Sequence, residues 1–164
     1  MKKEMTCCRI ALKWEGPFRL EEIVNEKKGP AGEGGLYQIY GTHTVFGRGS
    51  LLYIGKTETS FSSRFSQHEK WLKDEYDNVE IFLGVLIDEE GQEERDQHEL
   101  IMRSEKMLIY YCSPPYNSSE VFGNWSKGEW KKEYILYNFG RIGVLPPTVS
   151  SHWYFHEYWE KEND

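Results

Sequence analysis

The chain has 164 residues, of which 38% are hydrophobic and 15% aromatic, and its formal net charge is −7. This length allows one domain with a hydrophobic core, and the aromatic content argues against intrinsic disorder. No stretch approaches the roughly 20 consecutive apolar residues of a membrane span, and charged residues interrupt the segment where a signal peptide would lie. We therefore predict a single cytoplasmic domain over residues 1–164, with no membrane partner.

The negative charge is concentrated in one segment. Residues 74–99 contain eleven carboxylates and a single Lys or Arg, Arg95. Residues 1–73 contain twelve Lys and Arg against eight Asp and Glu, so this part of the chain is mildly basic. Because partners respond to the local distribution of charge, the acidic total does not exclude a nucleic-acid partner.

The three cysteines are Cys7, Cys8 and Cys112, and none of them forms a C-x-x-C pair. Neighbouring residues of a strand point to opposite faces, so Cys7 and Cys8 cannot chelate a metal together if they lie in a strand. The odd count and the spacing indicate reduced structural thiols.

The first half of the chain predicts alternating strands and helices, because its apolar residues recur first with period two and then every three or four positions. We expect, in chain order, a strand at 7–14, a helix at 18–28, strands at 35–41 and 50–56, and a helix at 60–73. The segment THTVFGRG at 42–49 contains two glycines, and we interpret it as an enlarged hairpin loop.

The second half predicts a strand at 78–87, an acidic turn, and a long helix at 92–112 that Pro114 and Pro115 end. Two aromatic strands follow at 133–140 and 152–159. The whole order predicts a mixed α/β (α+β) fold, with a small antiparallel or mixed sheet flanked by helices.

Several polar side chains suit chemistry on a phosphodiester. Arg64 and His68 lie four residues apart and share one helical face; a guanidinium matches phosphate oxygens, and an imidazole can move a proton near neutral pH. Glu105 offers the carboxylate that Mg²⁺ or Mn²⁺ requires. Tyr37 and Tyr53, on adjacent strands, supply phenols that could contact the attacking water or the phosphate. Together these residues would form a one-metal hydrolytic site.

The order of these residues resembles the GIY-YIG nuclease family. The matching elements are the GLY triplet at 35–37, the YIG triplet at 53–55, Arg64 with His68 one turn later, Glu105, and the PPYN segment that ends at Asn117. The resemblance implies a nuclease core at 34–117, with an N-terminal β-α extension at 1–33 and a C-terminal aromatic β extension at 118–164.

The resemblance also implies roles for these residues. Glu105 would hold one Mg²⁺ or Mn²⁺ ion on the scissile phosphate, and Arg64 would offset the charge of the transition state. Tyr37 would activate the attacking water and His68 would take its proton. Free tyrosine has a pKa near 10, so whether Tyr37 or His68 is the primary base stays open.

Three further positions match the family. Tyr53 and Lys56 would hold phosphate oxygens or water, and Asn117 would anchor the wall of the site. Taken singly, each of the site residues also has a structural explanation, as a strand aromatic, a solvated charge or a turn residue. Their conjunction, in one order and at matching spacings, favours the functional interpretation.

The predicted function is hydrolysis of DNA, most simply a duplex, by a restriction-type endonuclease, which would cut both strands as a homodimer. The alternatives are a repair or mobile-element nuclease, a catalytically silent nucleic-acid-binding or regulatory module, and a protein-interaction domain. The basic and aromatic segment NWSKGEWKK at 124–132 is a candidate DNA-contacting loop.

Overall fold

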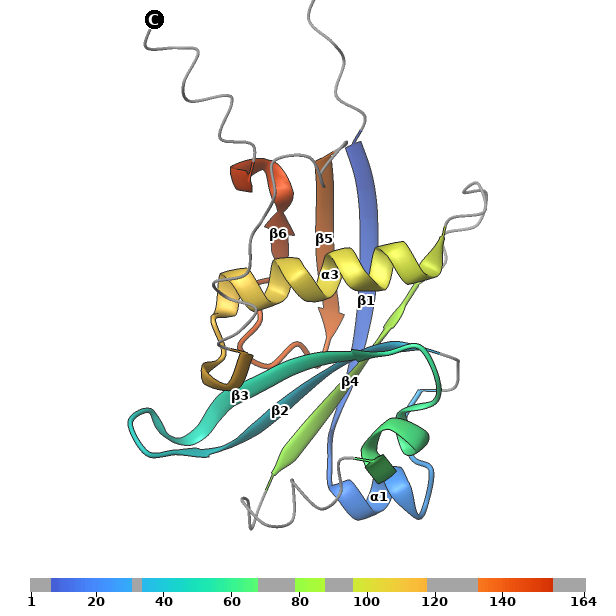
Figure 1. The fold of residues 1–164 in the computed structure, drawn as a ribbon, viewed down its shortest axis with the longest axis vertical. Helices are drawn as coiled ribbons and strands as arrows, with labels where there is room; N and C mark the ends of the chain where they lie inside the picture. Colours follow the sequence, from blue (N-terminus) through green and yellow to red (C-terminus); the bar gives the residue numbers. More distant parts are fainter. Residues whose placement is uncertain (1–6, 31–33, 68–78, 88–95, 118–132, 155–164) are drawn as a thin grey trace, which may run out of the picture.

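The computed structural model describes residues 7–30, 34–67, 79–87, 96–117 and 133–154 (Figure 1). The strands are β1 (Cys7–Phe18), β2 (Gly35–His43), β3 (Gly47–Thr57), β4 (Glu80–Leu86), β5 (Glu133–Gly140) and β6 (Thr148–Ser150). The helices are α1 (Leu20–Val24) and α3 (Gln97–Cys112), with 3-10 turns η1 (Pro115–Asn117) and η2 (Ser151–Tyr154); residues 61–67 are also helical. No helix in these ranges has the length and apolar character needed to cross a bilayer.

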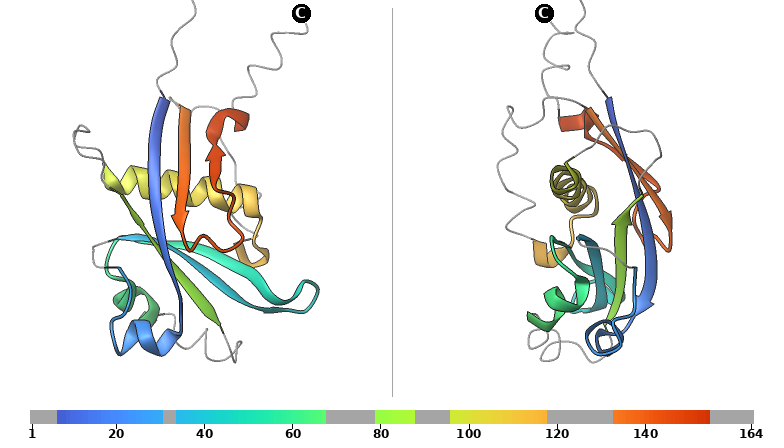
Figure 2. Two further views of the ribbon diagram at one scale, coloured as in Figure 1. Left: turned by 180° about the vertical axis from the view of Figure 1, so that it is seen from behind. Right: turned by 90° about the vertical axis from the view of Figure 1, so that its right-hand side faces the viewer.

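The six strands form one mixed sheet in the order β3-β2-β4-β1-β5-β6. Strands β1 and β5 pair in parallel, and the other neighbouring strands pair antiparallel. The sheet curls, so that β2 and β3 run steeply across the direction of β1 and β5 (Figures 1 and 2). The mixed α+β class expected from the sequence is confirmed.

Two hydrophobic clusters hold the sheet and its helices together. The larger one lies between α3 and the sheet and includes Leu12, Trp14 and Leu108. The smaller one joins α1, the helical segment 61–67 and the opposite face of β2 and β4, through residues such as Ile23 and Phe65. Strand β2 is therefore covered on both faces, and its first seven residues are all buried.

Three elements differ from the expectation. Strand β1 continues through Pro17 to Phe18, so the helix expected at 18–28 is shortened to α1. The loop expected at 42–49 is a turn of only three residues, 44–46, because β2 and β3 extend on either side of it. Gly47 permits this tight connection, since its φ of 84° is accessible to glycine without strain.

The end of the chain also differs. The strand expected at 152–159 is wrong over its first three residues, which belong to η2, and residues 155–159 lie outside the described ranges. The last strand is the shorter β6. Ser151 ends this strand where its side-chain oxygen accepts a hydrogen bond from the backbone N–H of Tyr134, at 2.8 Å.

Strand β5 has the expected bounds, and β4 lies inside the expected strand. Helix α3 ends at Cys112 as the two prolines indicate, but the start expected at 92 is wrong: the helix begins at Gln97, because Asp96 is its extended N-cap and accepts a hydrogen bond from the backbone N–H of Glu99. All three cysteines are free, and Cys7 is exposed while Cys8 is buried, as alternate faces of one strand require.

Candidate active site

Two tyrosines and a glycine lie side by side where β2 and β3 pair. Tyr37 is paired in register with Gly55, and its ring centroid is 6.0 Å from that of Tyr53. A Cβ atom at Gly55 would lie 2.5 Å from the Tyr37 hydroxyl oxygen and 2.6 Å from a ring carbon of Tyr53. Only glycine at position 55 therefore lets both phenols occupy this surface of the sheet.

The helical segment 61–67 brings Arg64 to the same place. Ser60 caps the segment by accepting a hydrogen bond from the backbone N–H of Ser63 at 3.2 Å. Phe65 is buried, and its ring packs edge-on to the Tyr37 ring with centroids 4.9 Å apart. Held in this way, Arg64 donates a hydrogen bond from Nε to the hydroxyl oxygen of Tyr37 at 3.3 Å.

Opposing effects set the protonation of this pair. Burial raises the pKa of Tyr37 and the negative charge of Glu105 adds to the rise, although the hydrogen bond and charge of Arg64 oppose it. Partial burial alone would lower the pKa of Arg64, but its hydrogen bond to Tyr37 and the nearby acidic groups raise it overall. At neutral pH the site therefore holds a charged guanidinium against a neutral phenol.

Glu105 completes the arrangement from a third element. It lies in the middle of α3 and is half-buried. Its carboxylate is close enough to act electrostatically on both Tyr37 and Arg64. Residues from β2, the segment 61–67 and α3 thus act on one another through a hydrogen bond and through charge.

Lys56 follows Gly55 in β3, and its side chain pairs with an acidic residue. Its Nζ is 3.3 Å from Oε1 of Glu58, and the same oxygen is 3.0 Å from Nδ1 of His98. Sequence reasoning gave no role to Glu58 or His98. The spacing of Lys56 and Glu58 was the available signal, since residues two apart in an extended segment share a face.

Asn117 is buried and holds the edge of the sheet next to the site. Its Oδ1 accepts a hydrogen bond from the backbone N–H of Ile54 at 2.9 Å, and its Nδ2 donates to the carbonyl of Ile54 at 2.8 Å. Both backbone groups face away from β2, the neighbouring strand. Asn117 thereby fixes the strand between Tyr53 and Gly55, a geometry that agrees with the anchoring role expected for it.

The structure brings most of the expected residues together. Tyr37, Tyr53, Arg64 and Glu105 act on one another, and Asn117 binds the outer edge of β3 at Ile54. Lys56 pairs with Glu58 instead. His68 lies outside the described ranges, as does the candidate DNA-contacting segment 124–132. Within those ranges, no group of three or more His, Cys, Asp or Glu side chains could hold a metal ion by protein ligands alone.

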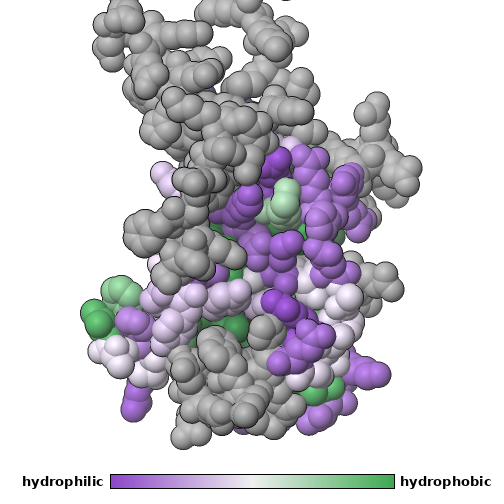
Figure 3. Space-filling view, viewed as in Figure 1, coloured by the Kyte–Doolittle hydropathy of each residue, from purple (hydrophilic) through white to green (hydrophobic). Residues whose placement is uncertain are grey.

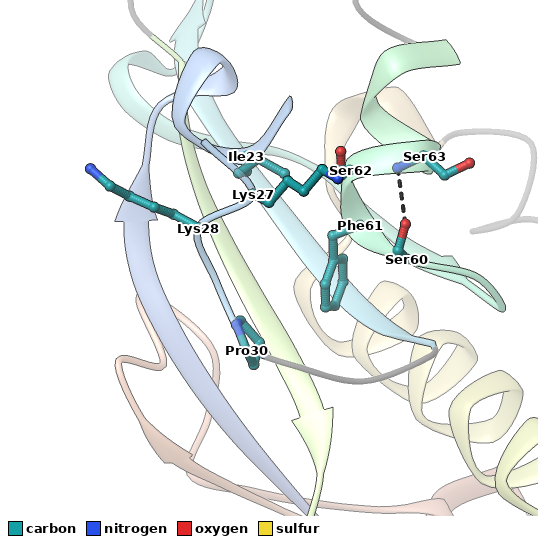
Figure 4. Close-up of a pocket in the computed structure, with 8 residues that line it drawn as sticks. All are labelled: Ile23, Lys27, Lys28, Pro30, Ser60, Phe61, Ser62 and Ser63. Carbon is teal, nitrogen blue, oxygen red and sulfur yellow. Dashed lines mark hydrogen bonds between the residues drawn. The ribbon is translucent and has the colours of Figure 1, made fainter. Parts of the chain in front are cut away.

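A separate open pocket lies between the chain that follows α1 and the start of the helical segment 61–67 (Figure 4). Lys27, Lys28 and three serines are among the residues that line it, and the amino group of Lys28 pairs with Glu22 and Glu26. None of the predicted site residues lines this pocket, so it is distinct from the tyrosine–arginine site.

No protein-family model matches the chain, and no curated protein or solved structure matches it either. The family resemblance therefore stays a prediction.

Proposed function

We propose that the chain is a divalent-metal-dependent endonuclease that hydrolyses DNA phosphodiester bonds with a GIY-YIG type of site. One observation carries the proposal: Arg64 donates to the phenol of Tyr37 while the charge of Glu105 acts on both. These three side chains come from separate elements of the fold: β2, the helical segment 61–67 and α3.

The donor set fits Mg²⁺ or Mn²⁺. Mg²⁺ keeps several waters and is usually bound through one or two carboxylates together with substrate phosphates. A single carboxylate, Glu105, beside phenol oxygens therefore suits the ion better than it suits zinc, which takes nitrogen and sulfur ligands. When bound, the ion would polarise a phosphate oxygen and make a coordinated water more acidic.

Arg64 is the group that stabilises the negative charge of the transition state. A guanidinium has five N–H donors, and the bond to Tyr37 uses only the one on Nε. The remaining donors can reach phosphate oxygens, where the gain is larger as negative charge builds up on them. The hydrogen bond to Tyr37 fixes the orientation of the guanidinium before the substrate arrives.

Tyr37 orients the reacting groups rather than taking the first proton. Its oxygen accepts from Arg64, which leaves its own hydrogen free to donate to a phosphate oxygen or to water. Burial raises the pKa of this phenol, so the ionised form that a base requires is scarce at neutral pH. We therefore assign the proton-accepting role to His68, whose intrinsic pKa suits it.

The test is cleavage of a supercoiled plasmid with Mg²⁺ or Mn²⁺ by the full chain. Glu105→Ala and Arg64→Ala should abolish cleavage, whereas Glu21→Ala, an exposed position on α1, should retain it. Discrete fragments would identify a restriction-type enzyme, and random nicking a repair or mobile-element nuclease. Equal activity in all variants would contradict the proposal, and DNA binding without cleavage would indicate a silent nucleic-acid-binding module.

A further inference from the structure

We infer that the hairpin tip, residues 43–48 between β2 and β3, is a wedge that places Phe46 against a base step of bound duplex DNA. The inference rests on the proposed function, because it assigns the tip a part in holding the same substrate. It concerns binding, however, and can fail while the cleavage proposal stands.

The hairpin tip exposes apolar side chains at the end of a projecting arm. Val45 is 78% exposed and Phe46 is 67% exposed, the highest values among the large hydrophobic residues in the described ranges. The β2–β3 hairpin extends well away from the rest of the sheet, and its end forms a hydrophobic patch on the surface (Figures 1 and 3). Such a grouping on a surface marks a contact with a partner.

Hydrogen bonds and ring contacts of His43 hold the backbone of the tip and the Phe46 ring. Nδ1 of His43 accepts hydrogen bonds from the backbone N–H groups of Val45, at 3.2 Å, and Phe46, at 3.3 Å. The His43 ring stacks on the Phe46 ring with centroids 4.8 Å apart, and the Tyr116 ring meets His43 edge-on at 5.9 Å. A side chain fixed in this way loses little conformational freedom on binding.

The charge of the arm suits a nucleic acid. The chain contains 27 Asp and Glu, yet the hairpin from Gly35 to Thr57 contains none of them. Its basic residues are Arg48, which is exposed at the tip, and Lys56, which pairs with Glu58 just beyond the hairpin. In an acidic protein, a carboxylate-free arm is complementary to phosphates, and basic residues beside an apolar wedge are typical of proteins that unstack base steps.

The position of the tip on the arm sets how far from the cleaved bond the tip would contact the DNA. The same arm carries Tyr37 near its base, six residues before His43. At about 3.3 Å per residue these positions are about 20 Å apart. A duplex lying along the arm from the site would meet the tip about six base pairs from the bond that is cut, given a rise of about 3.4 Å per base pair.

The experiment measures binding of a fluorescein-labelled random-sequence duplex of about three helical turns, in EDTA so that cleavage does not compete. We expect Phe46→Ala to weaken binding about tenfold or more, as loss of a base-stacking aromatic does. Arg48→Ala should weaken binding and reduce the salt slope by about 1. Phe139→Ala, a matched change at a 50% exposed phenylalanine on β5, should bind like the wild type.

A second readout tests insertion itself. Energy transfer between dyes at the two ends of the duplex should rise when the wild type binds, because a wedge kinks the DNA. The Phe46→Ala variant, at a concentration that saturates the duplex, should leave the duplex straight, whereas the Phe139→Ala variant should bend it as the wild type does.

The outcomes separate the two proposals. Wild-type affinity and bending in Phe46→Ala, together with cleavage that depends on Glu105, would overturn the wedge and leave the nuclease proposal intact. Loss of binding in Phe46→Ala without cleavage by any variant would support the wedge and overturn the nuclease proposal. A dimer that becomes monomeric in Phe46→Ala at unchanged DNA affinity would reassign the tip to self-association, and absence of DNA binding by the wild type would overturn both.

Discussion

Two groups among the described residues each contain a tyrosine, an arginine and a glutamate, and the hydrogen bonds of their phenols run in opposite directions. In the candidate active site, Arg64 donates to the phenol oxygen of Tyr37. In the second group, behind α3, the phenol of Tyr134 donates to Oε1 of Glu99 at 2.8 Å. Burial, followed by that hydrogen bond and the charge of Glu99, raises the pKa of Tyr134 to about 12.

The direction of the hydrogen bond decides how readily each phenol ionises. A guanidinium on the phenol oxygen favours the ionised phenol, whereas a carboxylate on the phenol hydrogen opposes it. In the Tyr134 group, the guanidinium carbon of Arg103 lies 5.7 Å from the ring centroid, and its Nε is 3.6 Å from the Glu99 carboxylate. In the Tyr134 group the Glu99 carboxylate takes both the phenol hydrogen and the charge of Arg103, whereas in the Tyr37 group the phenol oxygen takes a hydrogen bond from Nε of Arg64.

The largest difference in cleavage rate should be between the alanine variants of the two carboxylates of α3, Glu105 and Glu99. Glu105→Ala should lower single-turnover DNA cleavage by at least about a hundredfold, the scale seen when a key electrostatic group is removed from an active site. Glu99→Ala should leave cleavage near the wild-type rate and instead lower the free energy of unfolding by about 1–3 kcal/mol, because Tyr134 loses its acceptor. Equal loss of cleavage in both variants would contradict the contrast.

The two arginines should differ next. Arg64→Lys keeps the positive charge but removes the planar guanidinium whose Nε–H donates a hydrogen bond to the Tyr37 oxygen. The cleavage rate should therefore fall about tenfold to a hundredfold. Arg103→Lys should leave the cleavage rate unchanged and affect only thermal stability. Single-turnover rates with saturating enzyme separate these results, and a fully active Arg64→Lys would remove the oriented guanidinium from the mechanism.

A pair of glycines provides a third comparison. A Cβ at Gly55 would strike the Tyr37 phenol, and one at Gly84 would strike the Trp14 ring at 2.7 Å. Each alanine variant should lower the free energy of unfolding by about 1–3 kcal/mol through overpacking. Only Gly55→Ala should also reduce the cleavage rate per folded molecule, measured after correction for the folded fraction by circular dichroism. Normal turnover in Gly55→Ala would show that the spacing of the phenols is unimportant.

The smallest effect is a pH dependence shared by two buried phenols. Burial raises the pKa of Tyr40 to about 12, as burial and Glu99 do for Tyr134, against about 10 in the unfolded chain. The stability that these neutral phenols contribute is present below pH 10 or so and is lost as the pH rises towards about 12. Alkaline unfolding followed by phenolate absorbance should show it, and Tyr134→Phe should reduce the loss.

The sequence predicts those elements in which local pattern and tertiary packing agree. Strand β5 and the end of α3 are of this kind, because aromatic alternation and two prolines leave few alternatives. Prediction from the sequence fails where a glycine or proline belongs to a strand. Gly47 pairs with His43 although its φ is positive, and β1 continues through Pro17 with a register shift after Glu15. Local propensity cannot reveal that a neighbouring strand holds such residues extended.

For the candidate site, residue types and order were enough to choose Tyr37, Arg64 and Glu105 but not to find their contacts. The pairing of Lys56 with Glu58, and of Glu58 with His98, joins β3 to the first turn of α3 across some forty residues of chain. The Tyr134 group could not be anticipated either, since it depends on where α3 crosses β5. Long-range geometry of this kind needs the fold.

The hydrogen bonds between Asn117 and Ile54 have a consequence beyond the site. Strand β3 is an edge strand of the described sheet, and the backbone N–H and C=O groups of an edge strand can pair with any extended peptide that meets them. The Asn117 carboxamide hydrogen-bonds to the N–H and C=O of Ile54, two of the groups that a foreign strand would otherwise pair with. Asn117, which fixes β3 beside the candidate site, therefore also opposes the addition of a foreign strand and the aggregation that such pairing begins.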